Sequence, residues 1–376
     1  MRPRVLMVGR TRYRLPLNGS LGRKFDALRE RLDLRVLGAA PRGAAAGDET
    51  FALQRGTLVA ALDGPLFYGS LPVRIARELR RTPADAILAQ SPFEALAALA
   101  GRSLARSDAA VVVEIHGDWR TWSRLYGSPA RAVVGPLADR AALVAIRHAD
   151  AVRTLSPFTT GLVRDAGVEP AGVFTTYTEL TAFSEPPVRP LPERPTALFV
   201  GVLERYKNVH AIADAWRLAS PRVPDALFRI VGDGRHRDVA EGLLRDLPGA
   251  VGWERRLETP EVVKAFDDAW LLLLASRSEG TPRVVLEALC RGRAVVGARA
   301  GGIPDVVWED ETGVLVDPDS PAEIADALVR VLADRPLAER LGAGGRARAE
   351  AWTYTADEYA ECVVELVERA VEARGA

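Results

Sequence analysis

The sequence predicts an α/β protein of two Rossmann-like domains that face each other across a cleft. Three observations carry this prediction: short apolar runs alternate with helical patterns, the alternation occurs twice, and a proline-rich stretch separates the two series. Strands that alternate with helices favour parallel sheets covered on both faces. At 376 residues, the chain also exceeds one ordinary hydrophobic core and suits two domains.

The expected elements follow one another along both series. In the first series, we expect strands at 5–8, 34–37, 86–89 and 110–115, and helices at about 21–31, at about 72–81 and from 92. In the second series, we expect strands at 197–200, 227–231, 250–251, 269–275 and 294–296, and helices at about 208–219, 237–245, 260–268 and around Glu287.

Proline and periodicity predict where the domains divide. The stretch 183–195 holds five prolines and no periodic pattern, which indicates a stiff linker. The expected domains are therefore 1–184 and 185–353, followed by a terminal segment, 354–376. That segment is expected to form one amphipathic helix whose apolar face holds Cys362, Val363, Leu366, Val367 and Val371.

Composition excludes several classes of protein. Apolar residues make up 48% of the chain and charged residues 27%, which is typical of a globular protein. Two cysteines, Cys290 and Cys362, are too few for a disulfide framework and favour a reducing compartment. We find no segment with the pattern of a signal peptide or a membrane span, so we expect a cytoplasmic protein. Nucleic acid is not expected as a partner, because no basic stripe alternates with aromatic residues.

The formal net charge of zero hides a division between the two halves. Residues 1–184 carry 25 basic and 17 acidic side chains, whereas residues 185–376 carry 25 and 33. The basic excess predicts either attraction between the domains or steering of an anionic donor, an acceptor or a lipid surface. Peripheral contact with the inner face of a membrane therefore stays open.

Two glutamates follow the strand expected at 269–275. Glu279 lies in the glycine-containing loop after this strand, and Glu287 lies about one turn into the next helix. Ligands bind beyond the carboxyl ends of strands in open α/β sheets, and free N–H groups at a helix start favour phosphate. Since Pro282 has no N–H, Arg283 and Val284 are the expected backbone donors.

Other candidate residues follow strands of both halves. Lys207 is one of only three lysines among 50 basic residues, and its compact ammonium is suited to a diphosphate. Gly232 and Gly234 follow the strand 227–231 and permit a tight turn or close backbone approach. Gly19 lies in the loop where a phosphate-binding turn is expected, although G-x-G-x-x-G is not matched and a nicotinamide cofactor is not expected.

His116 follows the strand expected at 110–115, and a segment rich in aromatic residues and arginines follows His116. Its imidazole is expected either to donate to a sugar hydroxyl or to act as a base oriented by Asp118. The residues after it mix aromatic rings with arginines, which can stack on a sugar and hold an anion, or can form a packed loop. The acceptor-side candidates are Trp119, Arg120, Arg124 and Tyr126.

The run from Ser276 to Leu289 resembles the E-x7-E signature of retaining glycosyltransferases of GT-B type, family 4. The similarity continues through Arg291–Gly297 and Gly301–Asp305, strongly in the second half of the chain and loosely in the first. The resemblance implies that Glu287 binds the ribose, that Glu279 contacts the donor sugar and that Lys207 neutralises the leaving diphosphate. It also places Gly232 and Gly234 in the nucleotide pocket and returns the terminal helix to the N-terminal domain.

The chain departs from the family pattern at two places. Val202 occupies the position of the family's arginine, and Arg205 is the candidate replacement for its charge. The family's asparagine-glycine turn before the linker is absent. Front-face attack with the departing phosphate as base is the expected mechanism, with Glu279 as a covalent nucleophile as the alternative.

The resemblance implies a nucleoside diphosphate sugar as co-substrate, with UDP or GDP expected, and no other cofactor. A metal is not expected, because Asp317 and Asp319 belong to a helix-start pattern that includes Ser320 and Pro321. The acceptor is a hydroxyl on a glycan, a lipid-linked compound or a secondary metabolite. Two alternatives remain, namely a sugar-nucleotide epimerase of the same fold and a two-domain binding protein without catalysis.

Overall fold

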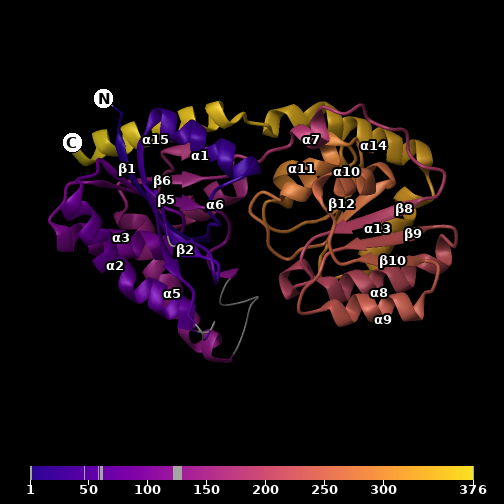
Figure 1. The fold of residues 1–376 in the computed structure, drawn as a ribbon. Helices are drawn as coiled ribbons and strands as arrows, with labels where there is room; N and C mark the ends of the chain where they lie inside the picture. The colour runs from indigo at the N-terminus through magenta and orange to yellow at the C-terminus, as the bar shows by residue number, and fades with distance from the viewer. Residues whose placement is uncertain (1, 46, 58, 60–61, 122–128, 376) are drawn as a thin grey trace. The chain divides into compact units, whose positions relative to one another are not determined.

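The computed structural model describes residues 2–45, 47–57, 59, 62–121 and 129–375 (Figure 1). The chain forms two compact units, and each contains one parallel sheet. Unit 1 comprises Met1–Tyr177 together with Tyr354–Ala376, and unit 2 comprises Thr178–Thr353.

Unit 1 is built on a seven-stranded sheet with the order β3-β2-β1-β4-β5-β6-β7. Every pairing in it is parallel. Its strands are β1 (Arg4–Arg12), β2 (Asp33–Ala40), β3 (Phe51–Arg55), β4 (Ala86–Ala89), β5 (Ala110–Ile115), β6 (Ala151–Thr154) and β7 (Gly172–Val173). Its helices are α1 (Gly19–Arg31), α2 (Asp63–Arg81), α3 (Pro92–Ala105), α5 (Pro129–His148), α6 (Pro157–Asp165) and α15 (Ala356–Gly375).

Alternating side chains of β1 supply both faces of this sheet. Val5 and Met7 pack in a core with α1 and α15, whereas Leu6 and Val8 pack in a core with α2 and α3. Because successive strand residues point to opposite faces, an uninterrupted apolar strand needs helices on both sides. The predicted doubly covered parallel sheet is therefore confirmed.

The terminal helix α15 packs on unit 1, as the predicted fold requires. Its buried face includes Tyr359, Val363, Leu366 and Val367, which belong to the core that also contains α1 residues. Val371, which the sequence pattern assigned to the same face, is 39% exposed. The predicted face is therefore wrong at Val371, whereas Ala370 beside it is buried.

Unit 2 contains a six-stranded parallel sheet with the order β10-β9-β8-β11-β12-β13. Its strands are β8 (Thr196–Val200), β9 (Leu227–Val231), β10 (Val251–Glu254), β11 (Leu271–Leu274), β12 (Ala294–Ala298) and β13 (Gly313–Val316). Its α-helices are α7 (Thr181–Ser184), α8 (Val209–Ala219), α9 (Arg237–Asp246), α10 (Thr259–Asp267), α11 (Arg283–Cys290), α12 (Ile303–Val306), α13 (Pro321–Leu332) and α14 (Arg335–Arg348). Three 3₁₀ turns complete it: η2 (Arg205–Lys207), η3 (Ser220–Arg222) and η4 (Ala349–Trp352).

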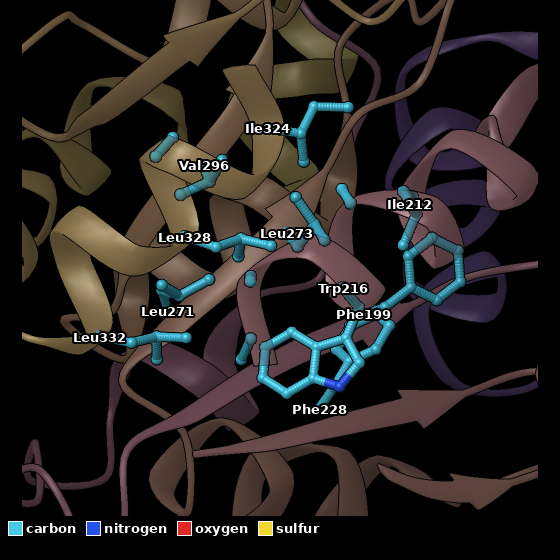
Figure 2. Close-up of a cluster of buried hydrophobic side chains, with 14 of the residues drawn as sticks. Phe199, Ile212, Trp216, Phe228, Leu271, Leu273, Val296, Ile324, Leu328 and Leu332 are labelled. Carbon is cyan, nitrogen blue, oxygen red and sulfur yellow. The ribbon is translucent and has the colours of Figure 1, made fainter. Parts of the chain in front are cut away.

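One face of the second sheet is covered by α8, α9 and α13. Figure 2 shows part of this core, where Trp216 of α8 lies beside Phe199 and Phe228 of the sheet. The indole of Trp216 is fully buried and its ring centroid lies 5.3 Å from that of Phe228. The opposite face packs against α10 and α11. This core fixes the strands whose carboxyl ends carry the candidate site.

The proline-rich stretch 183–195 is attached to unit 2 by buried arginines. Arg291 donates to the carbonyls of Phe183, Pro186 and Pro187, and Arg293 donates to that of Arg189. These guanidinium groups also contact Asp267, which balances part of their charge. The stretch therefore lies within the second compact unit, which begins at Thr178.

Ser320 caps α13 by accepting a hydrogen bond from the N–H of Glu323, so the predicted helix start is confirmed. Asp319 forms an ion pair with Arg277 at 2.7 Å. No helix within the described ranges combines the length and apolar character needed to cross a bilayer.

Candidate functional site

The loops at the carboxyl ends of β11 and β12 in unit 2 lie against each other. A Cβ built on Gly302 would lie 1.7 Å from the Gly280 carbonyl oxygen, and one built on Gly301 would lie 2.7 Å from the Glu279 nitrogen. Gly301 also has a φ of +58°, which other residues rarely adopt. Glycines 301 and 302 therefore let the two backbones approach closely and fix the loop that carries Glu279.

Lys207 reaches this loop from the other neighbour of β11. It ends η2 after β8, is only 8% exposed, and places Nζ 2.6 Å from Oε1 of Glu279. The Glu279 side chain is 15% exposed. Two candidates that lie 72 positions apart in sequence thus form a partly buried ion pair.

Glu287 is buried within α11, the helix after that loop. Its carboxylate accepts a hydrogen bond from Nε of Arg283 at 2.7 Å, and Arg283 is 53% exposed. Burial raises the pKa of Glu287, and the Arg283 charge opposes this increase only in part. A buried acid with a raised pKa is costly to the fold, which is typical of functional sites.

The first turn of α11 offers backbone donors. Pro282 precedes Arg283 and supplies no side-chain cap. The first N–H groups of an α-helix have no intrahelical partner. The N–H groups of Arg283 and Val284 belong to this first turn, and their role as donors to an anion stays a prediction.

Three buried polar atoms belong to residues close to Glu279 in sequence, and no motif indicates them. Ser276 Oγ, Arg277 Nε and Thr281 Oγ1 are buried and have no hydrogen-bond partner within the described ranges. Buried polar groups are normally hydrogen-bonded. The only sequence signal of Ser276 and Thr281 is that they are small hydroxyl residues on both sides of a candidate acid.

Gly232 and Gly234 have a structural reason to be glycine. Gly232 has a φ of +147°, and a Cβ there would lie 1.8 Å from the Gly201 carbonyl oxygen. A Cβ on Gly234 would lie 2.4 Å from the Leu203 carbonyl oxygen. The turn after β9 thus packs directly on the loop that leads to Lys207, while its role in a nucleotide pocket stays a prediction.

Arg205 lies in a different environment from Lys207. It is exposed and lines a surface hollow with Asn208, His210, Arg277 and other residues, among which neither Lys207 nor Glu279 occurs. The replacement of the family's arginine by Arg205 therefore stays a prediction. Gly19 begins α1 with a φ of +55°, and a Cβ there would meet no atom within 4 Å.

In unit 1, His116 follows β5 and its Nε2 lies 3.3 Å from Oε2 of Glu114. Asp118 instead accepts two hydrogen bonds from the Arg120 side chain, at 2.7 and 3.0 Å. The expectation that Asp118 orients His116 is therefore wrong, because the Asp118 carboxylate binds Arg120 and the acid that contacts the imidazole is Glu114.

The acceptor-side candidates are only partly described. Nε1 of Trp119 is buried without a hydrogen-bond partner in the described ranges, and the Arg120 guanidinium lies 5.8 Å from its ring centroid. Arg124 and Tyr126 lie outside the described residues. Among the described residues, no group of three or more His, Cys, Asp or Glu side chains is arranged to hold a metal ion.

Two known family models match the chain, one in each half. Residues 184–348 match the model described as glycosyl transferases group 1, and residues 25–178 match that of glycosyltransferase family 4. The two matches divide the chain near the boundary between its compact units.

Similar proteins carry related names. The chain is 30% identical to the sulfoquinovosyl transferase of Arabidopsis thaliana over 44% of its length, and 32% identical to the D-inositol 3-phosphate glycosyltransferase of Corynebacterium glutamicum over 42%. These matches span 32% and 40% of those relatives. A GDP-mannose-dependent phosphatidylinositol monomannoside mannosyltransferase of Mycobacterium tuberculosis is 29% identical over 67% of this chain and 68% of its own.

Solved structures share the fold at low sequence identity. The sucrose-phosphate synthase of Thermosynechococcus elongatus matches with a TM-score of 0.75 at 18% identity, over 93% of this chain and 95% of its own. The HepE protein of Anabaena, in complex with UDP and glucose, matches with a TM-score of 0.67 at 16% identity, over 96% and 98%. Two Rossmann-like units of this kind define the GT-B class of glycosyltransferases. The chain belongs to the family 4 type within that class.

Proposed function

We propose that this protein transfers a sugar from a nucleoside diphosphate sugar to an acceptor hydroxyl, with retention of the anomeric configuration. The observation that carries the proposal is the Lys207–Glu279 ion pair at the carboxyl edge of the second sheet. The resemblance to family 4 transferases implies a donor-side role for both residues, and this proposal adopts that role. Partial burial strengthens their electrostatic interaction with a charged ligand.

The donor diphosphate is assigned to Lys207 and to the first turn of α11. The ammonium of Lys207 exchanges its Glu279 partner for phosphate oxygens, and the N–H groups of Arg283 and Val284 donate to the same group. Glu279 then accepts from hydroxyls of the donor sugar, and Glu287 accepts from the ribose. Gly232 and Gly234 belong to the base pocket, and Arg205 and Gly19 are further donor-side candidates.

These residues favour a mechanism based on position and fixed charge. Cleavage of the sugar–phosphate bond places negative charge on the departing diphosphate, which Lys207 and the α11 donors stabilise. Attack from the same face, with the departing phosphate accepting the acceptor's proton, retains the configuration. The proposal requires no metal and no further cofactor.

UDP and GDP are the nucleotides that the comparisons favour. HepE is described in complex with UDP, and the mycobacterial relative is named as GDP-mannose-dependent. The acceptor is a hydroxyl compound for which Trp119 and Arg120, together with Arg124 and Tyr126, are the candidate binding residues. The two free cysteines are consistent with a cytoplasmic location.

Peripheral membrane contact through unit 1 remains part of the proposal. On α2, the exposed side chains of Leu66, Val73, Arg77 and Arg80 follow one helical stripe. Apolar and basic side chains on one exposed face favour an anionic lipid surface. A lipid-linked acceptor would then be reached at the membrane.

The test is a donor screen with the purified full chain. UDP- and GDP-sugars are incubated with and without candidate acceptors, and the anomeric configuration of new products is read by NMR. Transfer or slow donor hydrolysis with retention supports the proposal. Inverted products, or an epimerised donor formed without any acceptor, would refute it.

Matched lysine variants locate the site. Lys207→Ala is expected to abolish most turnover, whereas Lys264→Ala, which removes a 70% exposed lysine paired with Asp268, is expected to retain it. Equal activity of the two variants would remove Lys207 from the donor site.

A further inference from the structure

A chain of buried charges links the core of unit 1 to His116. Glu114 of β5 and Arg153 of β6 are direct partners in the parallel register. Arg153 is fully buried and Glu114 is 3% exposed, and NH1 of Arg153 donates to Oε1 of Glu114. The other carboxylate oxygen of Glu114 faces Nε2 of His116 at 3.3 Å.

Backbone carbonyls hold Arg153 in place. Its NH2 donates to the carbonyls of Phe174 and Thr175 at 3.0 and 2.9 Å. Its guanidinium also lies 4.0 Å from the ring centroid of Phe174. Arg153 therefore fixes the carboxylate of Glu114 through Oε1, and Oε2 remains to accept a hydrogen bond from the imidazole.

The environment of Glu114 keeps it ionised. Burial acts to raise the pKa of Glu114, but the Arg153 charge, the His116 hydrogen bond and Lys24 of α1 together hold it below the ordinary value. Tyr359 of α15 and Tyr13 after β1 also face this cluster and interact with Lys24. An ionised carboxylate can only accept hydrogen bonds.

The tautomer of His116 follows from this constraint. Because Glu114 can only accept, Nε2 of His116 must carry the proton that it donates. In the neutral imidazole, Nδ1 is then an acceptor. Asp118 does not compete for the ring, because its two oxygens bind Arg120.

We propose that Glu114 is a positioning residue that fixes His116 with Nδ1 presented as a hydrogen-bond acceptor for a substrate hydroxyl. The role of His116 rests on the proposed sugar transfer, whereas the tautomer does not. His116 is expected from the sequence either to donate to a sugar hydroxyl or to act as a base. With the proton on Nε2, Nδ1 of the neutral ring can accept a proton or a hydrogen bond from the substrate but cannot donate one. Partners that orient a histidine in this way typically contribute about 10- to 100-fold to function in metal sites, and we expect a similar loss here.

A second arginine–carboxylate pair offers a matched control. Asp150, whose side chain is 12% exposed, accepts hydrogen bonds from Arg102 and from the N–H of Val111 at the opposite end of β5. Asp150→Asn therefore removes the charge of a partly buried arginine partner that binds the backbone of β5, without touching His116. A purely structural role of Glu114 predicts the same consequences for Glu114→Gln and Asp150→Asn.

The experiment begins with the wild-type protein. Its four histidines are labelled with ¹⁵N, the His116 signals are assigned by loss in His116→Asn, and the nitrogen shifts are read at about pH 8.5, above the usual histidine titration range. We expect the Nε2–H tautomer in the wild type and a mixture in Glu114→Gln. An Nδ1–H tautomer in the wild type would overturn the proposal, and this result requires no variant of Glu114 to fold.

Kinetics provide the second readout. We expect kcat to fall about 10- to 100-fold in Glu114→Gln with KM changed less than about twofold, partial recovery in Glu114→Asp, and near-normal kcat in Asp150→Asn. Equal kcat in Glu114→Gln and Asp150→Asn would overturn the positioning role. If the wild type uses no nucleotide sugar, the proposed transfer fails, while the tautomer measurement still decides the geometry.

Discussion

Replacing Glu287 by glutamine is expected to stabilise the protein while weakening its use of the donor. Glu287 is 7% exposed, so its ionised carboxylate is removed from water. The Arg283 partner that compensates is 53% exposed and lies four residues earlier on the same helix. Pairs of this kind contribute only about 0.3–0.5 kcal/mol, which is less than the usual cost of burying a charge.

The sign of the pH dependence follows from the raised pKa of Glu287. Burial favours the protonated form in the folded state, so the folded protein binds this proton more tightly than the unfolded chain. Stability from this group is complete below the ordinary carboxyl pKa of 4.5 and is lost as the pH rises through the raised folded value. Once the pH lies above the raised folded value, the cost of the charge is present, and glutamine removes it.

The expected gain in the free energy of unfolding is about 0.5–2 kcal/mol, which is the usual gain from a single stabilising substitution. For a unit of the size of Thr178–Thr353, which contains Glu287, each kcal/mol raises Tm by about 2–4 °C. Thermal unfolding of Glu287→Gln and wild type is measured at pH 7.5 and at pH 4, and we expect the gain only at pH 7.5. Nucleoside diphosphate sugar binding is measured in parallel and is expected to weaken.

A lower Tm for Glu287→Gln at pH 7.5 would refute this reasoning, because it would show that the Arg283 pair outweighs the cost of burial. An equal gain in Tm at both values of pH would also contradict this reasoning, because the gain would then not come from removing the charge of Glu287. Arg283→Gln serves as the control, since it removes the partner and leaves the buried acid, and it is expected to lower stability at pH 7.5.

The remaining predictions concern the support of the site. Arg291→Leu is expected to lower the free energy of unfolding in urea by about 3–5 kcal/mol, because it leaves Asp267 buried without its closest partner. Arg299→Leu, which breaks an exposed pair with Glu323, is the control and should cost less than about 1 kcal/mol. Similar costs for both variants would contradict the role assigned to burial. Gly232→Ala is expected to destabilise the protein and weaken donor binding, because its Cβ would lie 1.8 Å from the Gly201 carbonyl oxygen. Gly242→Ala on α9, where a Cβ meets no atom within 4 Å, is the control. Equal melting temperatures of the two variants would contradict this prediction, because the loops that contain Gly232 and Gly201 could then separate freely.

Parts of the fold were predictable because their signals are local. The apolar strand β11, the loop after it and the helix with Glu287 follow from hydrophobic pattern alone. Strands β3 and β6 were not predicted, because Gln54 and Arg55 end the first and Arg153 interrupts the second. Arg153 is tolerated in β6 because Glu114 and two backbone carbonyls bind its guanidinium. The pairing of Arg153 with Glu114 between strands leaves no trace in either segment.

The same limit applies to the candidate site. The scarcity of lysine singled out Lys207, and the structure brings it to Glu279. Proximity in sequence favours Asp118 as the partner of His116, whereas in the structure Glu114 contacts the same ring from within the strand. Its only signal was one acid in an otherwise apolar run, and the hydroxyl groups of Ser276 and Thr281 gave even less.

Donor binding by Lys207 is the central claim, and calorimetric titration of UDP and GDP tests it most directly. A lost charge-assisted contact costs about 1.5–3 kcal/mol, so Lys207→Ala is expected to raise Kd about 10- to 100-fold for the nucleotide that the wild type binds. Lys264→Ala is expected to leave Kd unchanged within about twofold. Wild-type affinity in Lys207→Ala would contradict the account, because the diphosphate would then be bound elsewhere.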